Sequence, residues 1–252
     1  MPGYRGAKRD VTKPTLPDSV FAGGADGYRI RMLSLGAESV YRPQHDTWLL
    51  IDALERSDAV VGRRVVDLCS GSGVVAIAAA ELGASAVIAL DISPAAVHCT
   101  QANALAAQVD VEAILGSWSQ ALEQEPFDVV VCNPPYVPVG PGTTPECVSP
   151  TGPMASWDGG PDGRLVLDPL CRSAAAMLAE GGSLFLVQSE FADTERSLRS
   201  LRATGLHAEI YAKQLIPFGP VLHGQANWLR ESGRLLPGRA EEWLVVIRAD
   251  KP

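Results

Sequence analysis

The chain has 252 residues, of which 46% are hydrophobic, so it can bury the core of one large domain. Its net charge is −8 and its pI about 5.0, which argues against attraction to nucleic-acid phosphates or anionic membranes. No apolar stretch reaches transmembrane length, the polar start is not typical of a signal peptide, and the five cysteines include no CxxC pair. We therefore expect a soluble, cytoplasmic protein with reduced thiols.

The first part of the chain is rich in Gly, Pro and charge and predicts a flexible arm before the folded domain. The expected organisation is an arm over residues 1–27 and a single domain over 28–252, with a lid segment at 28–63, a core at 64–252, and loop insertions at 137–163 and 216–240.

The lid segment contains two short β-rich runs, at 29–33 and 38–41, which predict a small hairpin. A helix follows, with apolar residues at helical spacing from Trp48 onward. Asp46 or Thr47 can serve as its N-cap. Alternatively, these two side chains belong to a lid and reach a bound ligand.

From residue 64 onward, apolar runs of strand length alternate with helical stretches. Ser93-Pro94 gives one helix an N-cap followed by proline at its first position. The expected strands are 64–68, 86–90, 109–115, 127–132, 182–188, 207–214 and 242–247, and the expected helices are 74–82, 94–107, 165–178 and 191–203. This alternation predicts an α/β fold with a mostly parallel seven-stranded sheet and right-handed crossovers.

The first strand of this pattern contains Asp67. A turn of small residues follows it directly, Cys69-Ser70-Gly71-Ser72-Gly73. Glycines let the backbone pass close to a ligand, and the next helix begins with free N–H groups. The spacing is not that of a dinucleotide fingerprint. Asp91 ends the next strand, where a carboxylate can accept both hydroxyls of a ribose. The sequence therefore predicts a nucleoside-containing cofactor at this turn.

Asn133-Pro134-Pro135-Tyr136 follows the fourth strand directly. The two prolines end the strand and stiffen the turn, at the sheet edge where α/β proteins place their ligands. A planar group bearing NH2 could donate its hydrogens to the Asn133 side-chain oxygen and the Pro134 carbonyl while Tyr136 stacks on its face. We expect this turn to hold such a group, with the lone pair of its nitrogen pointing out of the plane; the alternative is a simple proline-rich turn.

The chain resembles the class I S-adenosyl-methionine-dependent methyltransferases, and among them the HemK-like enzymes that methylate glutamine side chains of translation release factors. The resemblance covers roughly residues 38–248 and rests on VYRPQHDT, VVDLCSGSG, LDIS, GSW and FDVVVCNPPYVP. It implies a Rossmann-like class I methyltransferase fold with helices on both faces of the sheet.

The resemblance also implies roles for individual residues. Asn133, Pro134, Pro135 and Tyr136 would form the catalytic acceptor site. The cofactor S-adenosyl-L-methionine would contact Asp46, Thr47, Asp67, Cys69, Ser70, Gly71, Ser72, Gly73, Asp91, Ile92, Trp118 and Asn133, with the methionine end at the glycine turn, the ribose on Asp91 and the adenine beside Trp118.

The chain departs from the family pattern at two points. Cys69 stands where the family usually has its first glycine, and the helical N-terminal domain of the bacterial glutamine enzymes is missing, as in the shorter archaeal and eukaryotic members. The implied partner is a protein substrate, a release factor or a similar protein. The resemblance leaves room for a small activator subunit.

Three other functions stay open. Adenine amino-group methyltransferases acting on nucleic acid share the Asn-Pro-Pro-Tyr turn, although the acidic pI and the lack of a visible target-recognition domain argue against a nucleic-acid partner. A small-molecule N-methyltransferase and a non-enzymatic scaffold are the others. Nothing in the sequence requires a metal or a covalent nucleophile. The loop 137–163 is either a substrate-facing brace for the turn or a connection, and 216–240 either a helical excursion or a surface loop.

Overall fold

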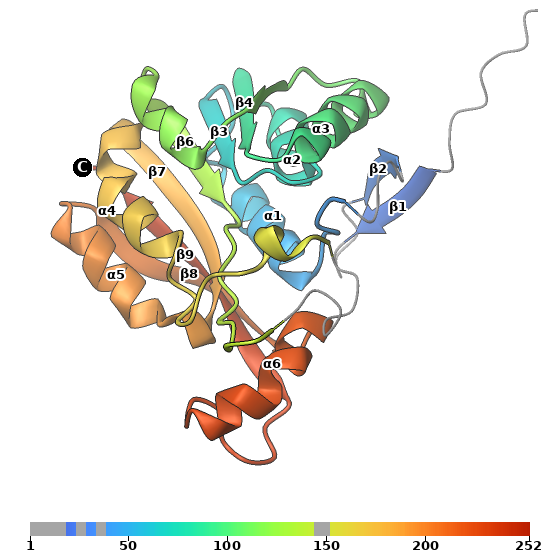
Figure 1. The fold of residues 1–252 in the computed structure, drawn as a ribbon. Coiled ribbons are helices and arrows are strands. Elements are labelled where there is room, and N and C mark those ends of the chain that lie inside the picture. The colour runs from blue at the N-terminus through green and yellow to red at the C-terminus, as the bar shows by residue number, and fades with distance from the viewer. Residues whose placement is uncertain (1–18, 24–28, 34–38, 144–151) are drawn as a thin grey trace, which may run out of the picture.

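Seven strands form one sheet in the computed structural model of the protein, which describes residues 19–23, 29–33, 39–143 and 152–252 (Figure 1). The strands are β3 (Arg64–Leu68), β4 (Ala86–Asp91), β5 (Glu112–Leu115), β6 (Phe127–Cys132), β7 (Leu178–Ser189), β8 (His207–Pro217) and β9 (Glu241–Asp250). Their order is β5-β4-β3-β6-β7-β9-β8; the first five are parallel, and β9 is antiparallel to both β7 and β8.

Helices cover both faces of this sheet (Figure 1). One face carries α1 (His45–Ser57), α2 (Val74–Glu81) and α3 (Pro94–Ala107), and the other carries the 3-10 helix η1 (Trp118–Glu123), α4 (Leu167–Met177) and α5 (Thr194–Ala203). The central strands β3 and β6 are buried on both faces, as their unbroken apolar runs predict. The predicted α/β fold with a mostly parallel seven-stranded sheet is confirmed.

The predicted strands and helices of the core are present, with differences at their ends. Ser93 caps α3, and its side chain accepts a hydrogen bond from the Ala96 backbone N–H. β8 and β9 are longer than predicted, because their antiparallel pairing runs from His207 and Asp250 out to Pro217 and Glu241. β7 begins earlier than predicted, at Leu178, which pairs in parallel with Phe127 of β6. Segment 216–240 contains a helix, α6 (Pro220–Glu231), which connects the end of β8 to the start of β9 and lies beyond the sheet there (Figure 1).

The predicted hairpin between 29–33 and 38–41 is wrong. Strand β2 (Arg29–Leu33) pairs instead with β1 (Ser19–Gly23), which lies within the expected flexible arm. Residues 39–41 lie outside any strand, and the Tyr41 hydroxyl donates to Asp46 of α1. The rest of the expected arm, 1–18 and 24–27, lies outside the described residues.

Within the described residues, no helix combines the length and the apolar character needed to cross a bilayer.

Candidate active site

A cavity of about 330 Å³ opens at the edge of the sheet where β3, β4 and β6 end. The glycine turn after β3 and Asp91 line one end. The Asn133–Tyr136 turn after β6 lines the other, together with the start of α1 and residues from β9 and α6. All the predicted site residues line this one cavity except Gly73: Asp46, Thr47, Asp67, Cys69, Ser70, Gly71, Ser72, Asp91, Ile92, Trp118, Asn133, Pro134, Pro135 and Tyr136.

The glycine turn has left-handed backbone at three positions, Cys69 (φ 59°), Gly71 (φ 56°) and Gly73 (φ 78°). A Cβ at Gly71 would meet no atom within 4 Å, so this glycine borders open space. A Cβ at Gly73 would lie 2.5 Å from Thr100 Cγ2, so Gly73 allows α2 and α3 to approach each other. The ligand contact at Gly71 stays a prediction that this open space permits, whereas the structure gives Gly73 a packing role.

The side chain of Ser70 indicates that this turn binds a polar group. Ser70 is 8% exposed and lines the cavity, and its Oγ has no hydrogen-bond partner among the described residues. A buried hydroxyl without a partner costs free energy, so a polar group of a bound molecule would stabilise it.

Asp91 organises the same end of the cavity. Its Oδ2 accepts a hydrogen bond from the Gly71 N–H (2.8 Å), and its Oδ1 accepts one from the Ser93 N–H (2.8 Å). Each carboxylate oxygen has a second lone pair, so the side chain can still accept hydroxyl donors. Trp118, the first residue of η1, and Ile92 also line the cavity; Trp118 is half-buried and Ile92 is exposed.

Asp67 lies beneath the turn. It is 1% exposed, and its Oδ2 accepts a hydrogen bond from the Ala76 N–H of α2 (3.1 Å). Burial, with a smaller contribution from the charge of Asp91, raises its pKa to about 8. The carboxyl group thereby ties the first turn of α2 to β3.

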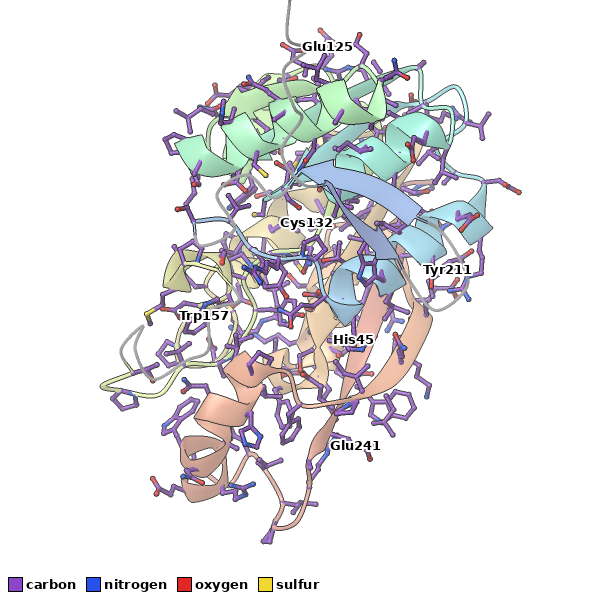
Figure 2. The ribbon with its side chains drawn as sticks, turned by 90° about the vertical axis from the view of Figure 1, so that its right-hand side faces the viewer. His45, Glu125, Cys132, Trp157, Tyr211 and Glu241 are labelled. Carbon is purple, nitrogen blue, oxygen red and sulfur yellow. The ribbon has the colours of Figure 1, made fainter. Side chains whose placement is uncertain are left out.

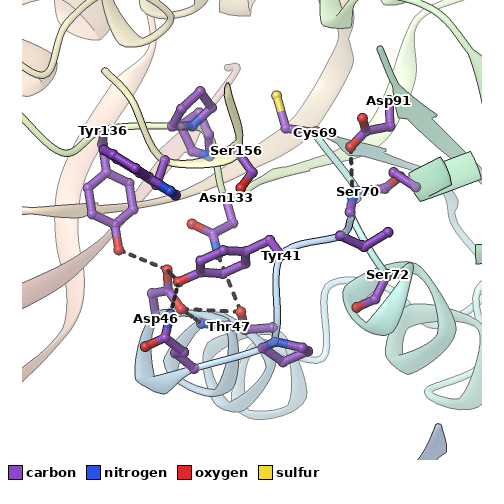
Figure 3. A pocket seen from close by; sticks show the side chains of 18 of the residues that line it. Tyr41, Asp46, Thr47, Cys69, Ser70, Ser72, Asp91, Asn133, Tyr136 and Ser156 are labelled. Carbon is purple, nitrogen blue, oxygen red and sulfur yellow. Dashed lines mark hydrogen bonds between the residues drawn. The ribbon is translucent and has the colours of Figure 1, made fainter. Parts of the chain in front are cut away.

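At the opposite end, Asp46 accepts hydrogen bonds from two tyrosine hydroxyls. Its Oδ2 accepts from Tyr136 (2.8 Å) and Tyr41 (3.0 Å), and its Oδ1 accepts from the backbone N–H (2.7 Å) and hydroxyl (3.2 Å) of Thr47 (Figure 3). Burial and the Asp46 charge raise the pKa of both tyrosines, so both stay protonated and donate.

The predicted N-cap at Asp46 or Thr47 is wrong, because α1 begins at His45 with Gln44 in the cap position. Asp46 lies in the first helical turn, and its side chain accepts a hydrogen bond from the Tyr136 hydroxyl of the Asn133–Tyr136 turn. Thr47 Oγ1 accepts a hydrogen bond from Asn133 Nδ2 (3.3 Å). The start of α1 therefore positions both polar residues of the Asn133–Tyr136 turn.

The segment after the turn folds back against it. Val137 N–H donates to the Trp157 carbonyl (3.0 Å), and Gly159 N–H donates to the Val137 carbonyl (2.9 Å). A Cβ at Gly163 would collide with the Tyr136 carbonyl oxygen, so this position requires glycine. Trp157 is buried and lines the cavity, and Figure 2 shows it and His45 on either side below Cys132, the residue before the turn. The described part of 137–163 thus braces the turn.

Sequence reasoning missed Glu242, which lies 6% exposed in the same cavity. It is the second residue of β9, and because β9 is antiparallel, this strand's start lies at the edge where the parallel strands end. Its Oε2 accepts a hydrogen bond from the Ser189 hydroxyl at the end of β7. A charged residue at the start of an apolar strand is an ordinary surface pattern, so only the strand order reveals it.

The described residues contain no group of three or more His, Cys, Asp or Glu side chains placed to hold a metal ion.

The chain has recognisable relatives. Residues 44–134 match the family model of the ribosomal protein L11 methyltransferase (PrmA). A Methanocaldococcus jannaschii protein described as an N5-glutamine methyltransferase is 30% identical over 179 residues, which cover 71% of this chain and 87% of that protein. Human methyltransferase HEMK2 is 35% identical over 176 residues, 66% of this chain and 79% of the human protein.

Among solved structures, the E. cuniculi Mtq2–Trm112 complex, described as responsible for methylation of the eRF1 translation termination factor, is similar in fold. It superposes with a TM-score of 0.57 at 23% identity, and the match covers 84% of this chain and 99% of that chain.

The sheet order, the glycine turn and Asp91 on adjacent strands, and these relatives define a class I methyltransferase that uses S-adenosyl-L-methionine. Within that class, the chain belongs to the HemK-like family, which includes the release-factor glutamine methyltransferases.

Proposed function

We propose that this protein methylates the side-chain amide nitrogen of a glutamine in a translation release factor or a similar protein. The observation that carries the proposal is the rigid Asn133–Tyr136 turn, held by α1 in the same cavity as the glycine turn. The similarity to the M. jannaschii N5-glutamine methyltransferase and to the E. cuniculi eRF1-methylating complex supports the choice of glutamine and of a termination factor.

The residues of the glycine-turn end fit S-adenosyl-L-methionine. The Ser70 hydroxyl lacks a partner that the polar methionine end would supply, and Asp91 has lone pairs left for ribose hydroxyls. Cys69, Gly71 and Ser72 would border the methionine end, and Trp118 would flank the adenine. When bound, the cofactor supplies an electrophilic methyl group on a sulfonium.

The acceptor turn would orient the amide. Thr47 holds Asn133 Nδ2, and no described residue donates to Oδ1 on the opposite side of this planar amide. Oδ1 can therefore accept a hydrogen from the acceptor NH2. The Pro134 carbonyl would accept the second hydrogen, and Tyr136 would cover the face of the group. These acceptors favour positive charge as it develops on nitrogen, and catalysis would consist mainly of positioning.

The test is methyl transfer from labelled cofactor to a glutamine-containing release-factor peptide, with the labelled product identified by mass. Because the E. cuniculi relative was solved with a second protein, the assay is run with the purified protein and with cell lysate added. We expect label on a glutamine amide. Label on adenine in nucleic acid or on a small amine, and none on protein, would contradict the proposal.

Asn133→Ala tests the acceptor turn itself. Loss of one preorganised hydrogen-bonding group should lower turnover by roughly 10²–10³, with cofactor affinity by calorimetry largely kept. Asn133→Asp retains an acceptor and should keep more activity than Asn133→Ala. Parental turnover in Asn133→Ala would remove this turn from the mechanism.

A further inference from the structure

We call the end of the cavity that the Asn133–Tyr136 turn lines its acceptor end. There, one carboxylate oxygen of Glu242 accepts a hydrogen bond, and the other has no donor among the described residues. The Ser189 hydroxyl donates to Oε2, and no group of the described residues donates to Oε1. The side chain lines the cavity beside Leu244 and Ile216, and Ile216 is its register partner on β8. Its charge also contributes to the raised pKa values of Tyr41 and Tyr136, the two tyrosines that donate to Asp46.

In the described part of the chain, four carboxylates line the cavity: Asp46, Asp67, Asp91 and Glu242. The first three have other tasks. Asp46 accepts four hydrogen bonds, which use the lone pairs of both oxygens. Asp91 is bonded through both oxygens at the glycine-turn end, and Asp67 lies buried under that turn. Glu242 is the carboxylate left at the acceptor end with an oxygen open.

The surroundings of Glu242 bring its pKa close to neutral pH. Burial raises its pKa most, and the charges of Asp46 and Glu190 raise it further. The Ser189 hydrogen bond and the Arg239 charge lower it, and the result is a pKa of about 7. A carboxylate poised near the working pH suits a general base.

We propose that Glu242 is the base that takes up the proton which the acceptor nitrogen releases on methylation, directly or through one water molecule. This inference rests on the proposed methyl transfer to nitrogen. It concerns the proton's destination and not the identity of the acceptor.

The nitrogen lone pair forms the new bond to the methyl carbon, the electron pair of the broken carbon–sulfur bond stays on sulfur, and the N–H proton passes to Glu242 Oε1. The carboxyl group then loses that proton to solvent. Without a base, the product nitrogen would carry the extra proton and a positive charge until solvent removed it.

The test compares Glu242→Gln with the parent and with Glu241→Gln. Gln keeps the size of the side chain and an oxygen for the Ser189 hydroxyl but cannot take up a proton. Glu241 is the exposed neighbour, labelled in Figure 2, and is the matched control. Parental turnover at saturating cofactor should fall about tenfold per pH unit below about pH 7. In Glu242→Gln, turnover should fall about 100-fold or more and lose this pH dependence, whereas Glu241→Gln should keep both.

Two further measurements separate chemistry from structure. Calorimetry should give the same cofactor affinity for Glu242→Gln as for the parent. The urea midpoint of the parent, but not of Glu242→Gln, should carry a component that titrates near pH 7. A parental pH limb in Glu242→Gln, or unfolding curves whose pH dependence is identical in both proteins, would overturn the proposal.

A different acceptor would not affect this comparison. If the glutamine peptide stays unmethylated while adenosine or an aromatic amine is methylated, the proposed function fails, and the same variants are compared on that acceptor with the same expected outcome.

Discussion

The turn at Cys69–Gly73 has left-handed backbone at three residues, and one of them is not a glycine. A side chain with a Cβ in this conformation costs roughly 1–2 kcal/mol, because Cβ approaches the following carbonyl oxygen. Cys69→Gly should therefore raise the free energy of unfolding by about 1 kcal/mol and leave cofactor affinity unchanged or slightly improved. Urea unfolding and calorimetry measure the two quantities.

Cys99→Gly is the control for this substitution, since Cys99 lies inside helix α3. Glycine there should lower the free energy of unfolding by about 1 kcal/mol or more. A Cys69→Gly protein that is as destabilised as Cys99→Gly would show that the left-handed backbone stores no strain.

Gly71 and Gly73 share this backbone conformation but border different surroundings. Gly71→Ala places a methyl in open space at the cavity, whereas Gly73→Ala places it against Thr100. We expect both to lose stability through the backbone, Gly73→Ala clearly more, and Gly71→Ala to lose cofactor affinity as well. Equal stability losses in urea unfolding would contradict the packing role of Gly73.

At the scale of elements, the start of α1 supports the acceptor turn from outside the sheet. Thr47→Val keeps the shape of the side chain and removes the hydroxyl that accepts from Asn133 Nδ2. Turnover should fall by about tenfold, less than in Asn133→Ala, while cofactor affinity stays unchanged. Single-turnover rates at saturating cofactor measure this effect.

Thr143→Val is the matched control for Thr47→Val. Its hydroxyl bonds to the Gly140 carbonyl and to Gln225, away from the two polar residues of the turn. Loss of turnover in Thr143→Val as large as in Thr47→Val would mean that α1 has no special connection to the turn.

At the scale of the whole molecule, two buried carboxyl groups make stability depend on pH. The pKa of Asp67 rises from 3.8 to about 8, and that of Glu242 from 4.5 to about 7. The folded protein thus binds these protons more tightly than the unfolded chain does. Their contribution is complete below about pH 4, and it is lost as the pH rises through about 7 and then about 8.

We therefore expect the urea midpoint to be higher at about pH 6 than at about pH 8.5. Asp67→Asn and Glu242→Gln should each flatten this dependence, Asp67→Asn at the higher pH. A midpoint that rises between these two pH values would contradict the expectation.

The central strands were predictable because burial on both faces requires unbroken apolar runs, and 64–68 and 127–132 match β3 and β6 residue for residue. Most cavity residues were predictable because they follow parallel strands directly. Asp46 was misassigned because its partners, Tyr41 and Tyr136, are brought to it by tertiary packing. Glu242 was missed because its place depends on the antiparallel course of β9, which local patterns do not reveal.

The position of β9 has a consequence for synthesis on the ribosome. Although β9 is the last strand in the sequence, it lies inside the sheet, between β7 and β8. The glycine turn, Asp91 and the Asn133–Tyr136 turn all leave the ribosome earlier than β9 does. A nascent chain that has already exposed all of these turns therefore still lacks Glu242. Only when β8 and β9, joined through α6, dock on β7 does the acceptor end close. Because a domain generally folds as a unit, we expect methyl transfer only after β9 has left the ribosome.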